Sequence, residues 1–161
     1  MGVLSRLRDF DEVAAEIGRE DAVAVLSCNN CVRACGTGGE MHLTRICNEL
    51  AARGVRVDEQ ILIPNPCSRG YLENYPLGDS IKAAVLMTCV GTEAGFRTVH
   101  PTVRTVTGVE SLGLFINSKA KGRLKLIAPF PGFENLKNKE FKLGDTKTMY
   151  EDEQLPLEVT P

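Results

Sequence analysis

The chain has 161 residues, 43% of them hydrophobic and 25% charged, and its formal net charge is -2. A chain of this length buries one core of ordinary size, so we expect a single domain with tails. The slightly acidic balance argues against a nucleic-acid or anionic-membrane surface, because both partners need clustered Lys and Arg to neutralise phosphates. We expect no nucleic-acid or membrane partner.

The pattern of apolar residues indicates in which cellular compartment the protein is expected, and the compartment in turn guides the interpretation of the cysteines. No run of about 20 apolar residues could span a bilayer, and the first residues lack the apolar stretch and cleavage site of a secretion signal. We therefore expect a cytoplasmic protein. In a reducing compartment the six cysteines are expected to be metal ligands, redox groups or small core residues rather than disulfides.

The first predicted elements are a helix and a buried strand. Apolar residues recur at helical spacing over Phe10–Ile17, and Gly18 ends the pattern. We assign residues 1–20 to this N-terminal helix. The continuous apolar run Ala22–Leu26 is typical of a parallel strand buried on both faces, and Cys28 follows its end.

Two further strands also end near a cysteine. A helix is predicted over residues 40–52, with Gly54 as its end. Residues 55–63 predict a strand that the prolines before Cys67 terminate, because proline cannot continue a central strand. Residues 83–87 repeat the buried-strand pattern and lead into Cys89.

The rest of the chain gives weaker patterns. A helix is predicted over 93–99, a strand over 103–106, a strand or helix over 112–116 and a strand over 124–128. Residues 134–161 turn polar and rich in Lys and Glu, and we interpret them as a docking arm or, with equal weight, as a partly disordered tail.

The alternation of strands and helices over residues 21–133 predicts one α/β domain. We expect a doubly wound, mainly parallel sheet of the flavodoxin-like or Rossmann-like kind. Right-handed crossovers then place the carboxyl ends of all its strands along one edge. Cys28, Cys67 and Cys89 would therefore meet at that edge, where such sheets bind ligands.

These cysteines predict a metal site. The fourth ligand would be Cys31 or Cys35, because the pattern Cys-x-x-Cys-x-x-x-Cys lets a loop turn several sulfurs towards one point. Four thiolates suit both zinc and iron-sulfur clusters. We favour a 4Fe-4S cluster over zinc, because structural zinc usually stabilises modules that lack a core and this chain has one.

Other residues are weaker candidates. Cys47 lies on the apolar face of its predicted helix and is interpreted as a core residue. His42 and His100 are each more easily explained as hydrogen-bonded residues than as ligands. Arg69, Glu93 and Arg97 are interpreted as solvated surface, so no catalytic residue is predicted.

The glycine-rich segment before the second helix is a candidate cofactor-binding loop. Gly36, Gly38 and Gly39 could expose amides to a phosphate, although the segment matches neither of the common nucleotide-binding motifs. The same amides could stabilise an anionic cluster beside the thiolates. The simpler interpretation is a tight turn that requires glycine.

Three stretches of sequence, at 27–39, 87–95 and 106–113, resemble the C-terminal domain family of methylenetetrahydrofolate reductases. That family also occurs as a small accessory subunit in one-carbon metabolism. The resemblance implies a protein that binds metal clusters, partners the flavin-containing catalytic subunit and exchanges electrons with its flavin. The positions that the resemblance implies as ligands are Cys28, Cys31, Cys35, Cys67 and Cys89.

Three functional hypotheses follow. The first is an iron-sulfur accessory subunit that transfers electrons to a methylenetetrahydrofolate reductase catalytic subunit or to another redox protein. The second is a non-redox zinc-binding interaction module. The third is a flavodoxin-like domain that binds a small molecule without any metal.

Overall fold

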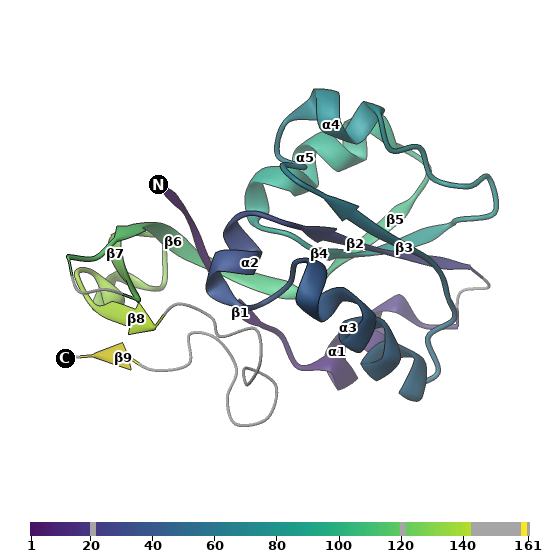
Figure 1. Cartoon of the computed structure of the whole chain (residues 1–161). Coiled ribbons are helices and arrows are strands. Elements are labelled where there is room, and N and C mark those ends of the chain that lie inside the picture. Colours follow the sequence, from purple (N-terminus) through teal and green to yellow (C-terminus); the bar gives the residue numbers. More distant parts are fainter. Residues whose placement is uncertain (20–21, 120–121, 143–158, 161) are drawn as a thin grey trace.

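The chain folds into two sheets that meet side by side. The structure is a computed structural model and describes residues 1–19, 22–119, 122–142 and 159–160 (Figure 1). One sheet is parallel and has four strands in the order β3-β2-β4-β5, and the other is antiparallel in the order β1-β6-β7-β8-β9. Strands and helices alternate in the first part of the chain, and strands dominate the last.

The elements follow one another closely along the chain. In order they are β1 (Gly2–Leu7), α1 (Phe10–Ile17), β2 (Val23–Cys28), α2 (Cys31–Cys35), α3 (Glu40–Ala52), β3 (Val57–Ile63), α4 (Arg69–Glu73), β4 (Ala83–Met87), α5 (Val90–Val99), β5 (Arg104–Thr107), β6 (Val109–Asn117), β7 (Arg123–Pro129), the 3-10 turn η1 (Glu134–Leu136), β8 (Glu140–Lys142) and β9 (Val159–Thr160).

The parallel sheet is covered by helices on both faces. Every residue of β2 and β4 is buried, which explains why both segments are continuous apolar runs. Because side chains alternate along a strand, Val25 of β2 packs with α1 and α3, whereas Leu26 packs with Leu72 of α4 and Phe96 of α5. Figure 1 shows α1 and α3 on one side of this sheet and α4 and α5 on the other.

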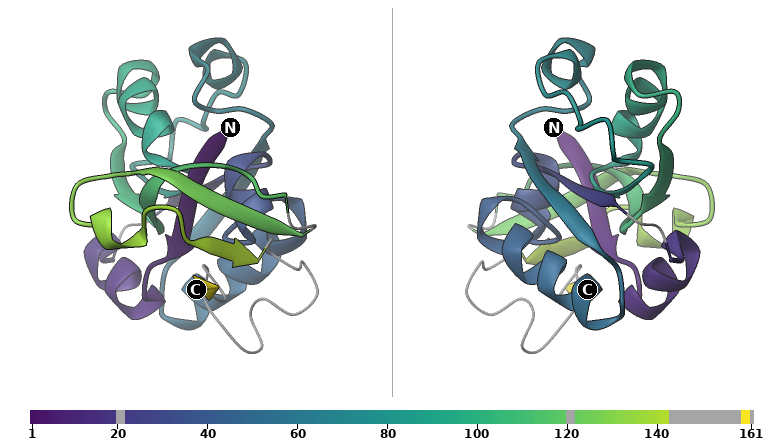
Figure 2. Two further views of the ribbon diagram at one scale, coloured as in Figure 1. Left: turned by 90° about the vertical axis from the view of Figure 1, so that its left-hand side faces the viewer. Right: turned by 90° about the vertical axis from the view of Figure 1, so that its right-hand side faces the viewer.

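The antiparallel sheet has its own core. Its buried apolar side chains are Leu4, Leu112, Phe115, Leu124, Leu126 and Phe141, and Cys35 of α2 completes the cluster. Its strands β6, β7 and β8 follow one another as antiparallel neighbours. The left view of Figure 2 looks at the molecule from the side of this sheet. The green strands β6, β7 and β8 lie in front there, and the purple strand β1 runs behind them.

The prediction of a doubly wound, mainly parallel fold is wrong. The molecule is a mixed α/β structure in which a curled antiparallel sheet stands beside the parallel one. Burial alternates over residues 123–127 of β7, as expected for an antiparallel strand with one face covered. Because β5 runs almost directly into β6 and β6 pairs with β1, no helix separates the two sheets at this point.

Several individual elements agree with the predictions. The helix over Phe10–Ile17 and the strand Ala83–Met87 are confirmed. The strand β1, within the region assigned to an N-terminal helix, was not predicted. Residues 134–142 of the expected arm contain η1 and β8, and Phe141 of β8 is 1% exposed, so this part belongs to the sheet. Residues 143–158 and 161 of the arm lie outside the described residues.

Among the described helices, none combines the length and the apolar character that a membrane crossing requires.

Two histidines are expected to make the stability of the fold sensitive to acid. Burial lowers the pKa of His42 in α3 and of His100 at the end of α5 from the ordinary value of 6.5. Below about pH 6.5 the unfolded chain therefore binds protons at these rings more readily than the folded chain. The contribution of the two neutral rings to the free energy of unfolding is therefore complete above that pH and is lost as the pH falls. The urea midpoint should decrease between about pH 7.5 and pH 5.5.

A double variant, His42→Gln with His100→Gln, should show a smaller decrease over the same range. Other groups that titrate in this interval are common to both proteins, so the difference between the two curves isolates the histidines. Parallel curves for the two proteins would show that the two rings contribute nothing to the acid sensitivity.

Candidate metal centre

Three cysteines lie at one edge of the parallel sheet, as the sequence predicted. Cys28 is the last residue of β2, Cys67 follows the end of β3, and Cys89 follows β4 and caps the N-terminus of α5. The strands β3, β2 and β4 are adjacent. The chain crosses from β2 to β3 on one side and returns to β4 on the other, so Cys28 and Cys89 flank the point where the winding direction changes.

Cys31 joins these three residues from the first turn of α2. Its sulfur lies where the thiol of Cys89 can donate to the Cys31 thiolate, and its charge also acts on Cys28. Cys67 is near enough to Cys28 to affect its ionisation. A Cβ atom placed on Gly91 would lie 3.4 Å from Cβ of Cys67 and 3.7 Å from Sγ of Cys89, so both residues lie close to Gly91.

The four cysteines gather without forming a closed shell around one ion. A single zinc ion bound by four thiolates at about 2.3 Å would hold their sulfurs about 3.8 Å apart. Within the described residues, no group of three or more His, Cys, Asp or Glu side chains is arranged to hold a metal ion. The fit to a metal group therefore depends on the grouping of the thiols and on the donors around them.

Backbone amides lie beside three of the four sulfurs, those of Cys28, Cys31 and Cys89. The amide of Asn30 donates to Sγ of Cys28 over 3.3 Å. Further amide donors are Val3 to Cys31 and Gly91 to Cys89. Because an N–H group stabilises a negatively charged sulfur, this environment suits thiolates or an anionic cluster better than neutral thiols.

The ionisation of the cysteines follows from these contacts. The hydrogen bond from Cys89 lowers the pKa of Cys31 to about 6, and the amides assist. The same hydrogen bond, followed by burial, raises the pKa of Cys89. Burial raises the pKa of Cys28. The site thus favours a thiolate at Cys31 beside the thiols of Cys28 and Cys89 near neutral pH, and metal binding would release protons from those thiols.

Cys35 is close enough to this group for the charges of Cys31 and Cys28 to act on its ionisation, but it lies in another core. It is fully buried in the core of the antiparallel sheet, and its thiol donates to the carbonyl of Val3 over 3.6 Å. Burial raises its pKa to about 12. Cys47 is likewise buried among apolar side chains of α1 and α3, and burial raises its pKa to about 11. Both residues occupy core positions.

The glycine-rich loop uses its amides within the chain. Gly36 ends α2 in the left-handed conformation, and its N–H donates to the carbonyl of Arg33. The N–H of Gly39 donates to Oγ of Ser27 over 2.8 Å, and the N–H of Glu40 donates to Oδ1 of Asn29 over 3.1 Å. These contacts fasten the loop to the end of β2 and favour its interpretation as a tight turn.

Gly38 is expected to tolerate no side chain. A Cβ atom there would lie 2.8 Å from Oγ of Ser27 and 2.9 Å from Cγ2 of Val32, both in the buried interior. We expect Gly38→Ala to lower the free energy of unfolding by about 1–3 kcal/mol, measured by urea denaturation. Gly70→Ala is the matched control, because a Cβ at Gly70 meets nothing within 4 Å. Equal stability of the two variants would contradict the close packing.

Sequence reasoning missed the contribution of β1 to the site. This strand brings the amide of Val3 to Cys31, and a Cβ atom on Gly2 would lie 3.1 Å from Sγ of Cys31. The segment is short and precedes a helix directly, so its pairing with β6, more than 100 positions away, has no local signal.

The other polar candidates from the sequence lie in surface ion pairs or in the packed interior. Arg69 bonds to Glu73 over 2.7 Å, and Arg97 bonds to Glu93 over 2.6 Å. The ring of His100 packs against that of Phe96 at a tilt of 46°, with ring centroids 4.8 Å apart. His42 is buried in the face of α3.

Comparison with models of known protein families, with curated proteins and with solved structures gave no match.

Proposed function

We propose that the chain binds a 4Fe-4S cluster through Cys28, Cys31, Cys67 and Cys89 and serves as an electron-transfer subunit. The main support is the grouping of these cysteines at the carboxyl ends of three adjacent strands, with amide N–H donors directed to their sulfurs. Cys35 is left out of this ligand set because it is fully buried in the core of the other sheet.

The position of the site suits exchange of electrons with a partner. When bound, a cluster accepts or gives one electron at a time. The chain supplies the thiolates, the amide donors and a partial cover of apolar residues that together set the potential. Cys67 is exposed, and Val90, next to Cys89, is 53% exposed, so this edge of the sheet lies at the surface.

The proposed partner is a flavin-containing methylenetetrahydrofolate reductase catalytic subunit, or another redox protein with a flavin. The support is the resemblance of the stretches around Cys28 and Cys89 to the small accessory subunits of those enzymes. A flavin takes up two electrons, so a one-electron donor would reduce it in two steps. In this proposal the chain itself performs no catalysis.

The test is metal and sulfide analysis with a visible spectrum on protein purified without oxygen. The proposal predicts about four irons and four sulfides per chain and a broad brown absorbance that dithionite bleaches. One zinc ion without colour would instead support a structural module, and protein free of metal would refute both proposals.

Electron transfer is tested separately from cluster binding. Dithionite-reduced protein, freed of excess reductant, is mixed anaerobically with the oxidised catalytic subunit, and the flavin absorbance is followed. Reduction of the flavin supports the proposed partner. A stable cluster with no flavin reduction would retain the metal site and reject this partner.

A further inference from the structure

The strand β1 is the outermost strand of the antiparallel sheet, and two cysteines of α2 lie along its free edge. An edge strand leaves the N–H and C=O groups of alternate residues without a neighbouring strand. The thiol of Cys35 donates to the carbonyl of Val3 over 3.6 Å, and the amide of Val3 donates to the sulfur of Cys31. Both backbone groups of Val3 therefore face α2 and bond to sulfur.

The spacing of the two cysteines explains how one short helix reaches both groups. Cys31 begins α2 and Cys35 ends it, four residues later, so the two side chains lie on the same face of the helix. The amide and the hydroxyl of Ser5 also act on the sulfur of Cys35. Because a thiol can donate and accept, one sulfur serves the carbonyl of Val3 and the N–H of Ser5.

These contacts are made in the interior. Cys35 and Ser5 are both 0% exposed, and Oγ of Ser5 is bonded to Oγ1 of the buried Thr37 over 2.8 Å. A backbone group left unpaired in such a place costs free energy comparable to a lost hydrogen bond. An apolar side chain at position 35 would fill the space without pairing with β1, so the position calls for a group that can form hydrogen bonds.

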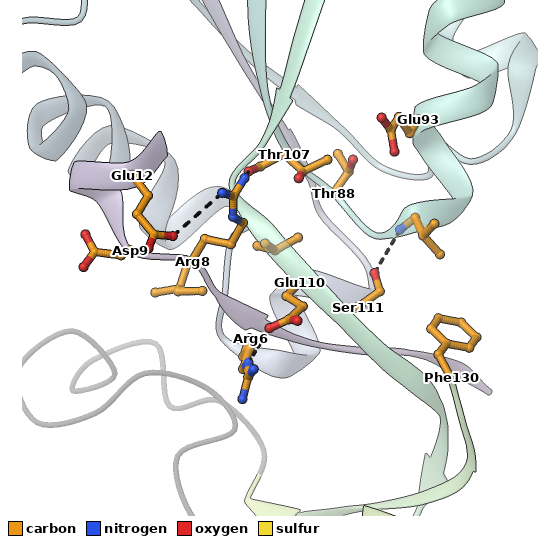
Figure 3. Close-up of a pocket in the computed structure, with 13 residues that line it drawn as sticks. Arg6, Arg8, Asp9, Glu12, Thr88, Glu93, Thr107, Glu110, Ser111 and Phe130 are labelled. Atoms are coloured by element: carbon orange, nitrogen blue, oxygen red, sulfur yellow. Dashed lines mark hydrogen bonds and ion pairs between the residues drawn. The ribbon is translucent and has the colours of Figure 1, made fainter. Parts of the chain in front are cut away.

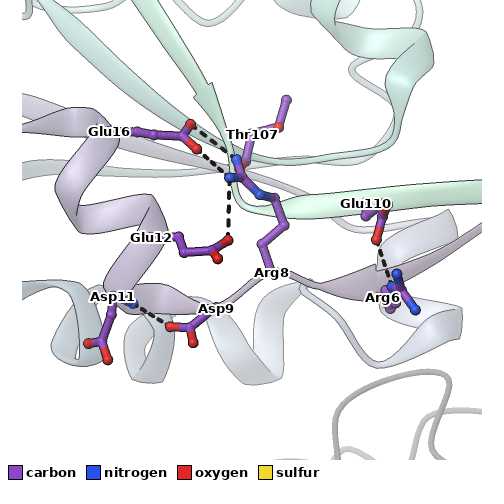
Figure 4. Close-up of polar contacts among 8 residues, drawn as sticks. All are labelled: Arg6, Arg8, Asp9, Asp11, Glu12, Glu16, Thr107 and Glu110. Atoms are coloured by element: carbon purple, nitrogen blue, oxygen red, sulfur yellow. Dashed lines mark hydrogen bonds and ion pairs between the residues drawn. The ribbon is translucent and has the colours of Figure 1, made fainter.

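The other end of β1 is held by ion pairs. Arg6 bonds to Glu110 of β6 over 2.6 Å, and Arg8, which follows β1, bonds to Glu16 of α1 and to the carbonyl of Thr107 (Figure 4). These contacts are made at the end of β1 that leads into α1, away from the residues that contact α2. The sulfur contacts are thus the ones that fasten the first half of the strand.

The antiparallel sheet also reaches the second helix that carries a cysteine. A pocket of about 610 Å³ lies between the end of β1 and the start of α5, and Leu7 and Val90 both line it (Figure 3). At this pocket the hydroxyl of Ser111 in β6 accepts from the amide of Val90, which follows Cys89, over 3.0 Å. Ser111 is the partner of Ser5 in the pairing of β1 with β6. One pair of strands therefore contacts both α2 and α5.

We propose that Cys35 is a positioning residue of the metal centre, whose thiol holds the edge of β1 so that the amide of Val3 stays on the sulfur of Cys31. This inference rests on the proposed function, because it takes Cys31 as a ligand. It gives the last cysteine of the pattern Cys-x-x-Cys-x-x-x-Cys a role other than that of a ligand. An N–H donor to a ligand sulfur stabilises the reduced, more negative cluster and raises its potential.

The first test is the reduction potential of the cluster in Cys35→Ala and Cys35→Ser, measured by a redox titration of the full chain without oxygen. We expect Cys35→Ala to keep its iron and to shift the potential to a more negative value, because the amide of Val3 is no longer held. Cys35→Ser keeps a group that donates and accepts, and should recover most of the shift. Cys47→Ala deletes a buried thiol of the other core and should leave the potential unchanged.

The second test uses the metal-free chain and follows hydrogen exchange of the Val3 amide by NMR. We expect this amide to exchange about tenfold faster in Cys35→Ala than in the wild type, and to stay slow in Cys35→Ser and Cys47→Ala. Should the purified chain carry no iron, the proposed function fails, and this measurement alone decides whether Cys35 holds β1 on Cys31.

A variant that leaves Cys35 in place tests the donor itself. Val3→Pro removes the N–H that faces α2, and proline is tolerated in an edge strand where the lost N–H does not serve the ladder. We expect the same negative shift of potential as in Cys35→Ala and no further shift in the double variant. Wild-type potential and exchange in Cys35→Ala, an equal effect of Cys47→Ala, or an effect that serine does not reduce would each overturn the proposal.

Discussion

Replacing any one of Cys28, Cys31, Cys67 and Cys89 by Ala is expected to reduce bound iron and sulfide about tenfold or more in protein purified without oxygen. Each cysteine supplies one of the four thiolates of the proposed ligand set. When a cluster loses one thiolate, one of its irons is exposed to solvent and is easily lost from the protein. The readouts are iron and sulfide content and the visible absorbance.

Cys35→Ala and Cys47→Ala are the matched controls. Both remove a thiol of the same chain, and both residues lie buried in apolar cores outside the proposed ligand set. We expect these variants to keep the full iron content while losing about 1–2 kcal/mol of stability, because a small buried group is deleted. Loss of iron in Cys35→Ala together with retention in Cys67→Ala would assign the fourth ligand to Cys35 and contradict the proposed set.

The candidate site was more predictable than the fold around it. Cys28, Cys67 and Cys89 each follow a segment with a strong local signal: a continuous apolar run before Cys28 and Cys89, and a pair of prolines before Cys67. Since parallel strands align their carboxyl ends, the local predictions were sufficient to bring the three residues to one edge. The sequence does not decide whether Cys31 or Cys35 is the fourth ligand, because their spacing alone does not show which side chain faces the sulfurs of the other three cysteines.

The antiparallel sheet was hard to foresee because its pairing is not local. The strand β1 pairs with β6, which follows it by more than 100 positions. Its six residues offer too short a pattern to distinguish a strand from an extended lead into α1. The segment at 112–116 was left open between strand and helix, and only pairing with β1 and β7 decides for a strand.

The arrangement of cores indicates that the two sheets unfold together. In α2, Val32 packs in the core of the parallel sheet and Cys35 packs in that of the antiparallel sheet. Likewise β6 starts with Val109 in the first core and continues to Leu112 in the second. Figure 1 shows α2 lying between the two sheets. A perturbation of one core should therefore reach the other through these shared elements.

Phe96→Ala tests this linkage and is expected to lower the free energy of unfolding by about 3–5 kcal/mol, measured by urea denaturation. Phe96 is 0% exposed and packs from α5 against the outer side of the parallel sheet. Its removal leaves a cavity that the neighbouring strands cannot close, a large loss against the roughly 5–15 kcal/mol total stability of most domains. Thr98→Ala, at an exposed position of the same helix, should change stability by less than about 0.5 kcal/mol.

Hydrogen exchange then shows whether the loss is shared. If the sheets form one cooperative unit, the slowest amides of β4 and of β7 lose the same free energy of opening in Phe96→Ala, because both exchange only through global unfolding. A loss confined to β4, with β7 unchanged, would show that the antiparallel sheet unfolds on its own. The amide of Val3 reaches the cysteines from that second sheet. Cooperative unfolding would therefore make the stability of the antiparallel sheet a condition for holding the proposed metal centre together.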